Sequence, residues 1–400
     1  MRQEENIEKL ISIILFLGLF LNLGFVYFAQ ERLYLSESTG VNYLGSEKYL
    51  RILSVIFIFL TAILSLFKAR NQYHFSIYFV YLLLLVYICL NFSISGASFT
   101  NMTHLMDKKG VGTWICLGLI FVSYNNKRYL FFKKFLIFSI LYISLLSIYN
   151  IIDFGIGGWR MQAMSKYRVY AVNLVWLVPY GFLILKNNKK LKILRVYIMA
   201  IGIIIALIIQ TRSFLIIYFL TIIFDFFNTK NKAGYTIALG IGFVALTYLV
   251  LNTEVLSASY DLIVNRGTHD TRTEQLSRFF DQLDFFEVIT GKGYFASYFL
   301  NRNIYYYIDN QWLFLFWWGG LIPGLCYLYL SAIIPTKMIL IGNMNYETKV
   351  ECFILIIWVL GLGGLAIFST MSVDFFFFIV TILLGRVLYK YSLYKKGDGK

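Results

Sequence analysis

Residues 75–92 read FSIYFVYLLLLVYICLNF, an apolar stretch without a charged side chain. About 20 apolar helical residues cross the hydrocarbon of a bilayer, so this stretch predicts a membrane-spanning helix. The whole chain has the same character. Of its 400 residues 59% are hydrophobic and 14% are charged, against about 25% charged in soluble proteins. We therefore expect an all-α polytopic membrane protein.

The same length criterion predicts about 12 spans. Only Thr211 and Arg212 separate the seventh span from the eighth. The expected organisation is a membrane bundle at 1–251, one long polar loop at 252–310, and a second part of the bundle with a polar tail at 311–400. The predicted spans are 9–28, 50–67, 75–92, 110–124, 135–152, 169–185, 193–210, 213–227, 233–251, 311–334, 350–371 and 373–389.

The positions of Lys and Arg predict the orientation. With the N-terminus inside, most of the 36 Lys and Arg residues fall in inner connections and termini, as the positive-inside rule requires. Both termini are then cytoplasmic and the long loop 252–310 is periplasmic. The first apolar run is too long for a signal peptide, so we expect it to be retained. The net charge of +15 is explained by the cytoplasmic loops, so the expected partner is membrane lipid and not nucleic acid.

The long loop contains a predicted surface helix. Between Asp270 and Phe286 the apolar residues recur at three- and four-residue intervals. This spacing is typical of an amphipathic helix that lies against lipid or the bundle. Gly291 and Gly293 follow, and glycine at both positions lets the backbone approach a ligand closely.

Several basic residues lie in outward segments, against the orientation rule. They either pair with loop acids and lipid phosphates or bind an anionic ligand. For Arg212 the first explanation is weaker, because a guanidinium at a helix end is costly unless it faces a wet cavity or an anion. The outward basic residues considered for a site are Arg160, Arg168, Arg212, Arg266, Arg272, Arg278 and Lys292.

The sequence lacks the residues that a metal site or an ion-coupled transporter would need. The three histidines, at 74, 104 and 269, lie in different loops, so no metal site is predicted. The four cysteines lie inside apolar runs and are expected to be small buried hydrophobes. Asp225 and Glu351 lie at span ends, whereas ion-coupled transporters use ionisable groups near the midplane. We expect no metal and no cofactor.

Four segments together resemble a known family. They are Glu254–Gly324 with Gly291-x-Gly293-Tyr294, Asp309-Asn310-Gln311-Trp312-Leu313 with the glycines that follow, Gln210-Thr211-Arg212-Ser213, and Arg160–Asn173. In order and spacing they resemble the Wzy-type O-antigen and polysaccharide polymerases, to which the O-antigen ligases are related. Ligases have a His-Asn pair where this chain has Asp309-Asn310, so the resemblance favours a polymerase.

The resemblance implies a metal-independent, inverting glycosyltransferase of the GT-C type in the bacterial inner membrane. Its substrate would be an oligosaccharide repeat unit linked to undecaprenyl pyrophosphate, used in O-antigen and lipopolysaccharide biosynthesis. A polysaccharide chain-length regulator would be a further partner. Physical chemistry agrees, because nucleotide sugars are absent outside the cytoplasm and arginines can neutralise a leaving pyrophosphate in place of a metal.

The resemblance also implies roles for individual residues. Arg212 and Arg272 are predicted to contact the donor pyrophosphate, with Arg160 and Arg266 assisting. Because it opens a membrane helix, where burial raises a carboxyl pKa, Asp309 is favoured as the general base; the alternative is that it only caps the N-terminus of that helix. His269 is the rival base. The remaining predicted substrate-binding residues are Arg168, Arg278, Gly291, Lys292, Gly293, Tyr294 and Asn310.

Two other functions stay open. An O-antigen ligase would transfer the glycan to a lipid core. A flippase for lipid-linked oligosaccharides also needs about a dozen spans and arginines for pyrophosphate, but it does not need a long outer loop.

Overall fold

A computed structural model describes most of the chain. The described residues are 2–39, 47–101, 104–105, 107, 109–154, 164–208, 212–252, 277, 279–282, 284–300, 303–306, 308, 310–341, 344–360 and 375–397. The chain forms two compact units, which are described separately. Unit 1 comprises Met1–Leu33, Val41–Phe132 and Thr271–Lys400, and unit 2 comprises Tyr34–Gly40 and Lys133–Asp270.

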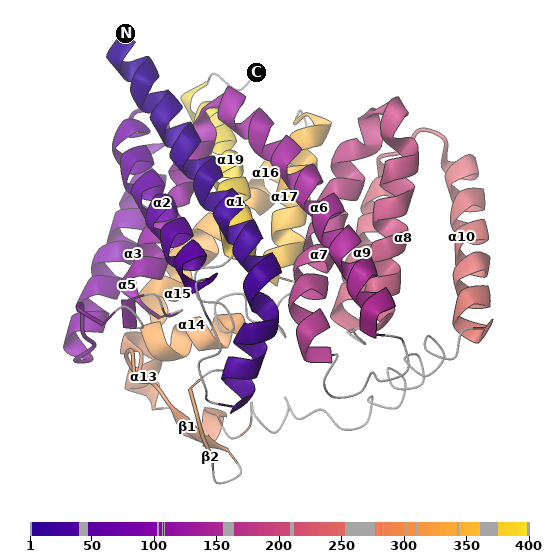
Figure 1. Cartoon of the computed structure of the whole chain (residues 1–400). Helices are drawn as coiled ribbons and strands as arrows, with labels where there is room; N and C mark the ends of the chain where they lie inside the picture. Colours follow the sequence, from indigo (N-terminus) through magenta and orange to yellow (C-terminus); the bar gives the residue numbers. More distant parts are fainter. Residues whose placement is uncertain are drawn as a thin grey trace. The chain divides into compact units, whose positions relative to one another are not determined.

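The described residues are mainly helical (Figure 1), and their helices include six that are long and apolar enough to cross a membrane. These six stretches are Glu5–Gly24, Tyr49–Lys68, Phe75–Ile94, Asn126–Tyr149, Leu321–Leu340 and Phe375–Lys396. Three shorter apolar helices lie at Val111–Tyr124, Leu174–Asn187 and Phe214–Phe227. The expectation of an all-α multi-pass membrane protein is confirmed, whereas the count of 12 spans stays a prediction.

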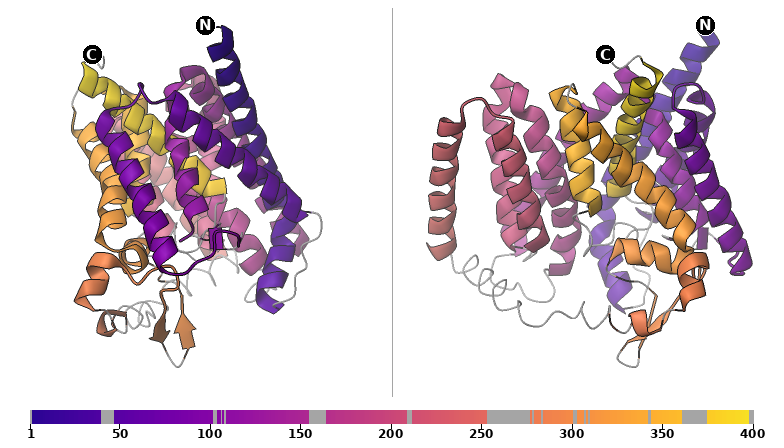
Figure 2. Two further views of the ribbon diagram at one scale, coloured as in Figure 1. Left: turned by 90° about the vertical axis from the view of Figure 1, so that its left-hand side faces the viewer. Right: turned by 180° about the vertical axis from the view of Figure 1, so that it is seen from behind.

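Unit 1 contains most of the long helices. The N-terminus of α1 and the C-terminal end of α19 lie at one end of this unit, and α13, β1 and β2 lie at the opposite end (Figures 1 and 2). Its helices are α1 (Arg2–Thr39, whose last turns belong to unit 2), α2 (Glu47–Lys68), α3 (Phe75–Ile94), α5 (Val111–Cys116), the 3₁₀ helix η1 (Leu117–Tyr124), α13 (Phe285–Thr290), α14 (Gln311–Gly319), α15 (Leu321–Leu328), the π-helix η6 (Tyr329–Ile333), α16 (Ile334–Leu340), α17 (Tyr346–Leu360) and α19 (Phe375–Lys396).

The fourth predicted span is short because part of it is a 3₁₀ helix. A 3₁₀ helix rises about 2 Å per residue and an α-helix about 1.5 Å, so α5 and η1 together rise about 25 Å, close to the hydrocarbon thickness. Side chains satisfy carbonyls of η1. Tyr73 Oη donates to Ile120 O (2.7 Å) and Arg386 Nη1 to Ser123 O (3.2 Å). Gly385 lets α19 approach, since a Cβ there would lie 2.0 Å from Ile120 O.

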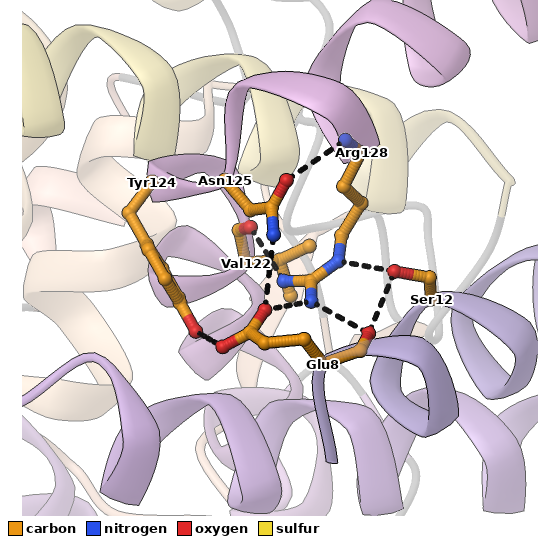
Figure 3. Close-up of polar contacts among 6 residues, drawn as sticks. All are labelled: Glu8, Ser12, Val122, Tyr124, Asn125 and Arg128. Atoms are coloured by element: carbon orange, nitrogen blue, oxygen red, sulfur yellow. Dashed lines mark hydrogen bonds and ion pairs between the residues drawn. The ribbon is translucent and has the colours of Figure 1, made fainter. Parts of the chain in front are cut away.

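An ion pair between a half-buried glutamate and a buried arginine joins α1 to the start of α6 (Asn126–Phe154), whose first turns belong to unit 1 (Figure 3). Arg128 Nη2 lies 2.6 Å from Glu8 Oε2, and the arginine side chain is only 1% exposed. Its other donors reach Ser12 Oγ (3.0 Å) and Val122 O (3.0 Å). Tyr124 Oη also donates to the Glu8 carboxylate. Because its hydrogen bonds are satisfied, this cluster is a structural tie between two helices.

A fully buried carboxylate in unit 1 belongs to Glu351 of α17. Tyr129 Oη donates to its Oε1 (2.7 Å), and Lys390 Nζ of α19 pairs with its Oε2 (2.8 Å). Glu351 lies in the second turn of α17, where it is fully buried and paired within the protein.

Unit 2 contains the rest of α6, α7 (Met164–Ile184), the 3₁₀ turns η3 (Leu185–Asn187) and η4 (Lys189–Leu191), α8 (Lys192–Ile208), α9 (Arg212–Phe227) and α10 (Lys232–Asn252). α8 and α9 are separate helices, as the sequence predicts. The carboxylate of Asp225, near the end of α9, is fully buried between Lys186 and Arg195.

The tenth predicted span, 311–334, is wrong as a single helix. α14 ends at Gly319, and Gly320 has φ +80°, which an α-helix cannot contain. The membrane helix is instead Leu321–Leu340. The nine-residue α14 lies across the direction of α3 at the end of unit 1 (Figures 1 and 2), and four of its side chains are almost fully buried.

The surface helix predicted at 270–286 is not continuous in the part that the structure describes, because the helix is interrupted at Asp284. Asp284 is the N-cap of a separate short helix, α13, with a capping box to Glu287. Beyond α13 lies an unpredicted hairpin of β1 (Tyr298–Leu300) and β2 (Asn303–Tyr305). The Gln282 amide exchanges two 2.9 Å hydrogen bonds with the backbone of Phe299 and so covers the outer edge of β1.

Candidate functional site

The candidate site lies at the end of unit 1 that carries α13, α14 and the hairpin. Its central feature is a crossing of two backbone segments, Ile289–Gly293 and Trp318–Gly320. A Cβ on Gly291 would lie 2.4 Å from Trp318 O, and a Cβ on Gly320 would lie 2.4 Å from Ile289 O. Both glycines have positive φ, +77° and +80°. Only glycine fits such a conformation at such a separation. We call this crossing the glycine junction.

The glycine junction also satisfies the carbonyl groups at the end of α14. The N–H of Lys292 donates to Trp317 O (2.8 Å), and the N–H of Gly293 donates to Trp318 O (2.9 Å). The last carbonyls of a helix have no partners within the helix and need such donors when they are buried. The loop at 291–293 is therefore the cap of α14. Its need for glycine is explained by contact with the protein itself, and direct contact with a substrate stays a prediction.

Lys109 holds the backbone that follows the glycine junction through two hydrogen bonds. Its Nζ donates to Tyr294 O (3.0 Å) and Ala296 O (3.2 Å), and it lies over the rings of Phe314 and Trp317 at 5.6 and 5.4 Å. The residue is 3% exposed. A buried ammonium is costly without such hydrogen bonds and aromatic faces, so this lysine fixes the turn at 294–296 against α14.

Tyr294, a predicted substrate-binding residue, is almost fully buried. Its N–H donates to Ser95 Oγ (2.9 Å), and its ring packs against Phe92 and His104, with centroids 5.2 Å apart in each case. Burial raises the pKa of the Tyr294 hydroxyl, and its hydrogen bond to Asp107 acts in the same direction. The hydroxyl therefore stays protonated at neutral pH and donates to Asp107.

Two other predicted residues have clear local roles. Asn310 is the N-cap of α14, and its Oδ1 accepts from the N–H groups of Trp312 (3.0 Å) and Leu313 (3.2 Å). The alternative that Asp309 caps this helix is therefore wrong. Lys292 Nζ pairs with Glu287 Oε2 (3.1 Å) and donates to Gln282 O (3.0 Å). This is the pairing with a loop acid that the sequence left open.

The remaining predicted residues are not brought together by the described part of the chain. Arg212 is the first residue of α9 and Arg168 lies in α7, but the structure does not describe their side chains. Six others lie outside the described residues: Arg160, Arg266, His269, Arg272, Arg278 and Asp309. Within the described residues there is no group of three or more His, Cys, Asp or Glu side chains that could hold a metal ion.

Sequence reasoning missed Lys109 and Asp107. One signal was present, because Lys108 and Lys109 precede the fourth span on the predicted outer side, against the positive-inside rule. Their partners could not be found from sequence, since Lys109 binds carbonyls 185 and 187 residues away.

Comparison with protein-family models, curated proteins and solved structures finds no match to this chain. The class that the fold defines is an all-α, multi-pass membrane protein with a packed polar end that combines a crosswise helix, a glycine junction and a short hairpin.

Proposed function

We propose that this protein is a glycosyltransferase that polymerises oligosaccharide repeat units carried on undecaprenyl pyrophosphate, at the outer face of the bacterial inner membrane. The observation that carries the proposal is the contact between two segments singled out from the sequence. Gly291-x-Gly293 caps the C-terminal end of α14, while Asn310 caps its N-terminal end. Two motifs that are separated along the chain thus cap the two ends of the same helix, α14.

The mechanism follows from the chemistry of the substrate. The acceptor hydroxyl attacks the anomeric carbon of the donor unit, the bond from that carbon to the pyrophosphate oxygen breaks, and the configuration inverts. Asp309 takes the hydroxyl proton. It directly precedes Asn310, the N-cap of α14, and a carboxylate is a suitable general base when its pKa is raised toward neutral.

The leaving pyrophosphate carries the developing negative charge. Arg212 and Arg272 bind it, assisted by Arg160 and Arg266, because guanidinium groups bind phosphate in a bidentate manner and keep their charge. In support of this role, Arg212 is the first residue of α9 and so lies at a helix terminus. Arginines alone can then provide the electrostatic stabilisation that other transferases obtain from a metal.

The experiment is deletion of the gene in its host, followed by gel analysis of surface and lipid-linked glycan. Loss of the polymerase leaves a single repeat unit on the acceptor, and expression of the intact chain restores the ladder. Polymer that accumulates on the lipid carrier would contradict the proposal in favour of a ligase. Lipid-linked units that accumulate on the inner leaflet alone would contradict it in favour of a flippase.

A further inference from the structure

Helix α13 exposes an apolar surface although it is folded tightly against the protein. It packs against α14 and α15. The side chains of Phe285, Phe286 and Ile289 are nevertheless 72%, 71% and 43% exposed. These three exposed apolar side chains on one short helix form a patch, and such patches mark contact with a membrane or with another protein.

One hydrogen bond fixes the position of α13 along the apolar helix α3. Tyr87 Oη of α3 donates to Thr290 O, the last residue of α13, at 2.9 Å. Tyr87 lies seven residues before the end of the spanning helix α3 at Ile94, which is about 10 Å along the helix axis. Helical side chains also tilt toward the N-terminus, so the hydroxyl lies no closer to the end of α3 than its own Cα does.

The length of α13 then limits how far it can extend beyond α3. Six helical residues rise about 9 Å, which is less than the distance of about 10 Å from Tyr87 to the end of α3. Measured along the α3 axis, α13 therefore does not extend beyond the end of α3. Figures 1 and 2 agree, because α13 lies beside the end of α3 in each view whereas the β1–β2 hairpin lies beyond it. At this level α3 itself exposes Leu90 and Ile94, as expected for residues that face lipid.

The polar groups of α13 are arranged consistently with this depth. The Asp284 side chain is used in the capping box at the start of the helix. Glu287 is half-buried and paired with Lys292, so its charge is compensated before it reaches lipid. No other ionisable side chain belongs to the Phe285–Thr290 helix.

We propose that α13 is an interfacial helix whose Phe285, Phe286 and Ile289 side chains lie at the boundary between lipid headgroups and acyl chains. It anchors the polar end of unit 1 in the leaflet, since aromatic side chains are favoured at this boundary and interfacial helices penetrate about 5–10 Å. The inference concerns the lipid surface and does not depend on the proposed transferase activity.

The test is site-directed spin labelling of the full chain in lipid nanodiscs of phosphatidylethanolamine and phosphatidylglycerol, with one copy per disc. Cys89, which is half-exposed, is replaced by serine; Cys116, Cys326 and Cys352 are buried. Nitroxides are placed at Phe286→Cys and Ile289→Cys. Leu90→Cys on α3 is the lipid reference, and Tyr306→Cys, just after β2, is the water reference.

The measured quantity is the ratio of accessibility to oxygen over accessibility to a water-soluble nickel chelate. We expect the ratio at positions 286 and 289 to exceed that at 306 several-fold and to approach that at 90. Equal ratios at 286, 289 and 306 would overturn the proposal and mean that protein or water, not lipid, meets α13.

A second measurement uses the unaltered chain and so does not depend on the folding of any variant. Hydroxyl-radical footprinting in the same nanodiscs should modify Phe285 and Phe286 several-fold less than Tyr306, although all three are more than half exposed in the protein alone. Equal modification of the three residues would contradict the proposal.

Discussion

Gly291 and Gly320 face each other at a backbone crossing so close that neither tolerates a Cβ. At each position the added atom would meet a carbonyl oxygen of the other segment at 2.4 Å. This crossing ends α14, starts the membrane helix Leu321–Leu340, and positions the loop that leads to the hairpin. The polar end of unit 1 is therefore built on one pair of glycines.

Replacement of either glycine should destabilise the protein strongly. For Gly291→Ala and Gly320→Ala we expect a loss of about 3 kcal/mol or more, because strain from positive φ adds to a contact with backbone that cannot move aside. The measurement is the midpoint of thermal unfolding in detergent. Gly96→Ala is the matched control, since Gly96 has φ +71° and nothing within 4 Å of its Cβ position. Equal shifts for the three variants would show that the crossing adds nothing beyond strain.

Lys109→Met tests the buried ammonium. The substitution keeps much of the side-chain volume but leaves the carbonyls of Tyr294 and Ala296 without this donor, which should cost about 3 kcal/mol in total. Thermal unfolding again provides the measurement. Lys396→Met is the control, because Lys396 also donates to two backbone carbonyls, Asn71 O and Gln72 O, but in an exposed position. A Lys109 variant as stable as the Lys396 variant would contradict the supporting role.

We expect Asn310 to have a structural role, as the cap of α14, and Asp309 to have a catalytic role, as the general base. Asn310→Ala should lower stability by about 1 kcal/mol through loss of the helix cap, and Asn310→Asp should restore it. Asp309→Asn should leave the unfolding midpoint unchanged, because Asn310 supplies the cap, but should slow chain extension about 10²–10⁴-fold through loss of the base. Full activity of Asp309→Asn would exclude Asp309 as the base and leave His269 to be tested.

The Glu8–Arg128 pair should be essential to the fold and not to the chemistry. Arg128→Met removes a buried guanidinium and leaves the half-buried Glu8 carboxylate without its charge partner, which should cost about 1–3 kcal/mol. The control is Lys9→Met in α1, the helix that contains Glu8. The partner of Lys9, Glu5, lies at the surface, so this variant should leave the unfolding midpoint unchanged. An Arg128 variant with unaltered stability would show that the cluster in Figure 3 is dispensable.

The sequence predicts membrane helices where the chain runs uninterrupted, as in α2 and α3, because composition alone determines partition into a bilayer. It fails at 311–334, where hydropathy is continuous across Gly320. The break there depends on the N–H groups of Lys292 and Gly293, which replace the next helical turn as partners of the carbonyls of α14. Such a break is a tertiary effect and leaves no signal in hydropathy.

The candidate site is predictable only in part for a related reason. Asp309 and Asn310 are equally good N-caps, so sequence cannot choose between them, and the backbone selects Asn310. The positions of the glycines were found from sequence, but the contact that requires them at 291 and 320 was not. Asp107 was missed because its partner, Tyr294, lies in a distant loop of the chain.

The most direct test of the proposed function uses the purified chain in liposomes with its host's repeat unit linked to undecaprenyl pyrophosphate, in the presence of a metal chelator. Gel analysis should show a ladder of products that differ by one repeat unit, and Arg212→Ala and Arg272→Ala should slow its formation about 10²–10³-fold at equal protein level. Lipid-linked units that remain unextended by the intact chain, or a ladder that forms equally fast with both arginine variants, would contradict the account.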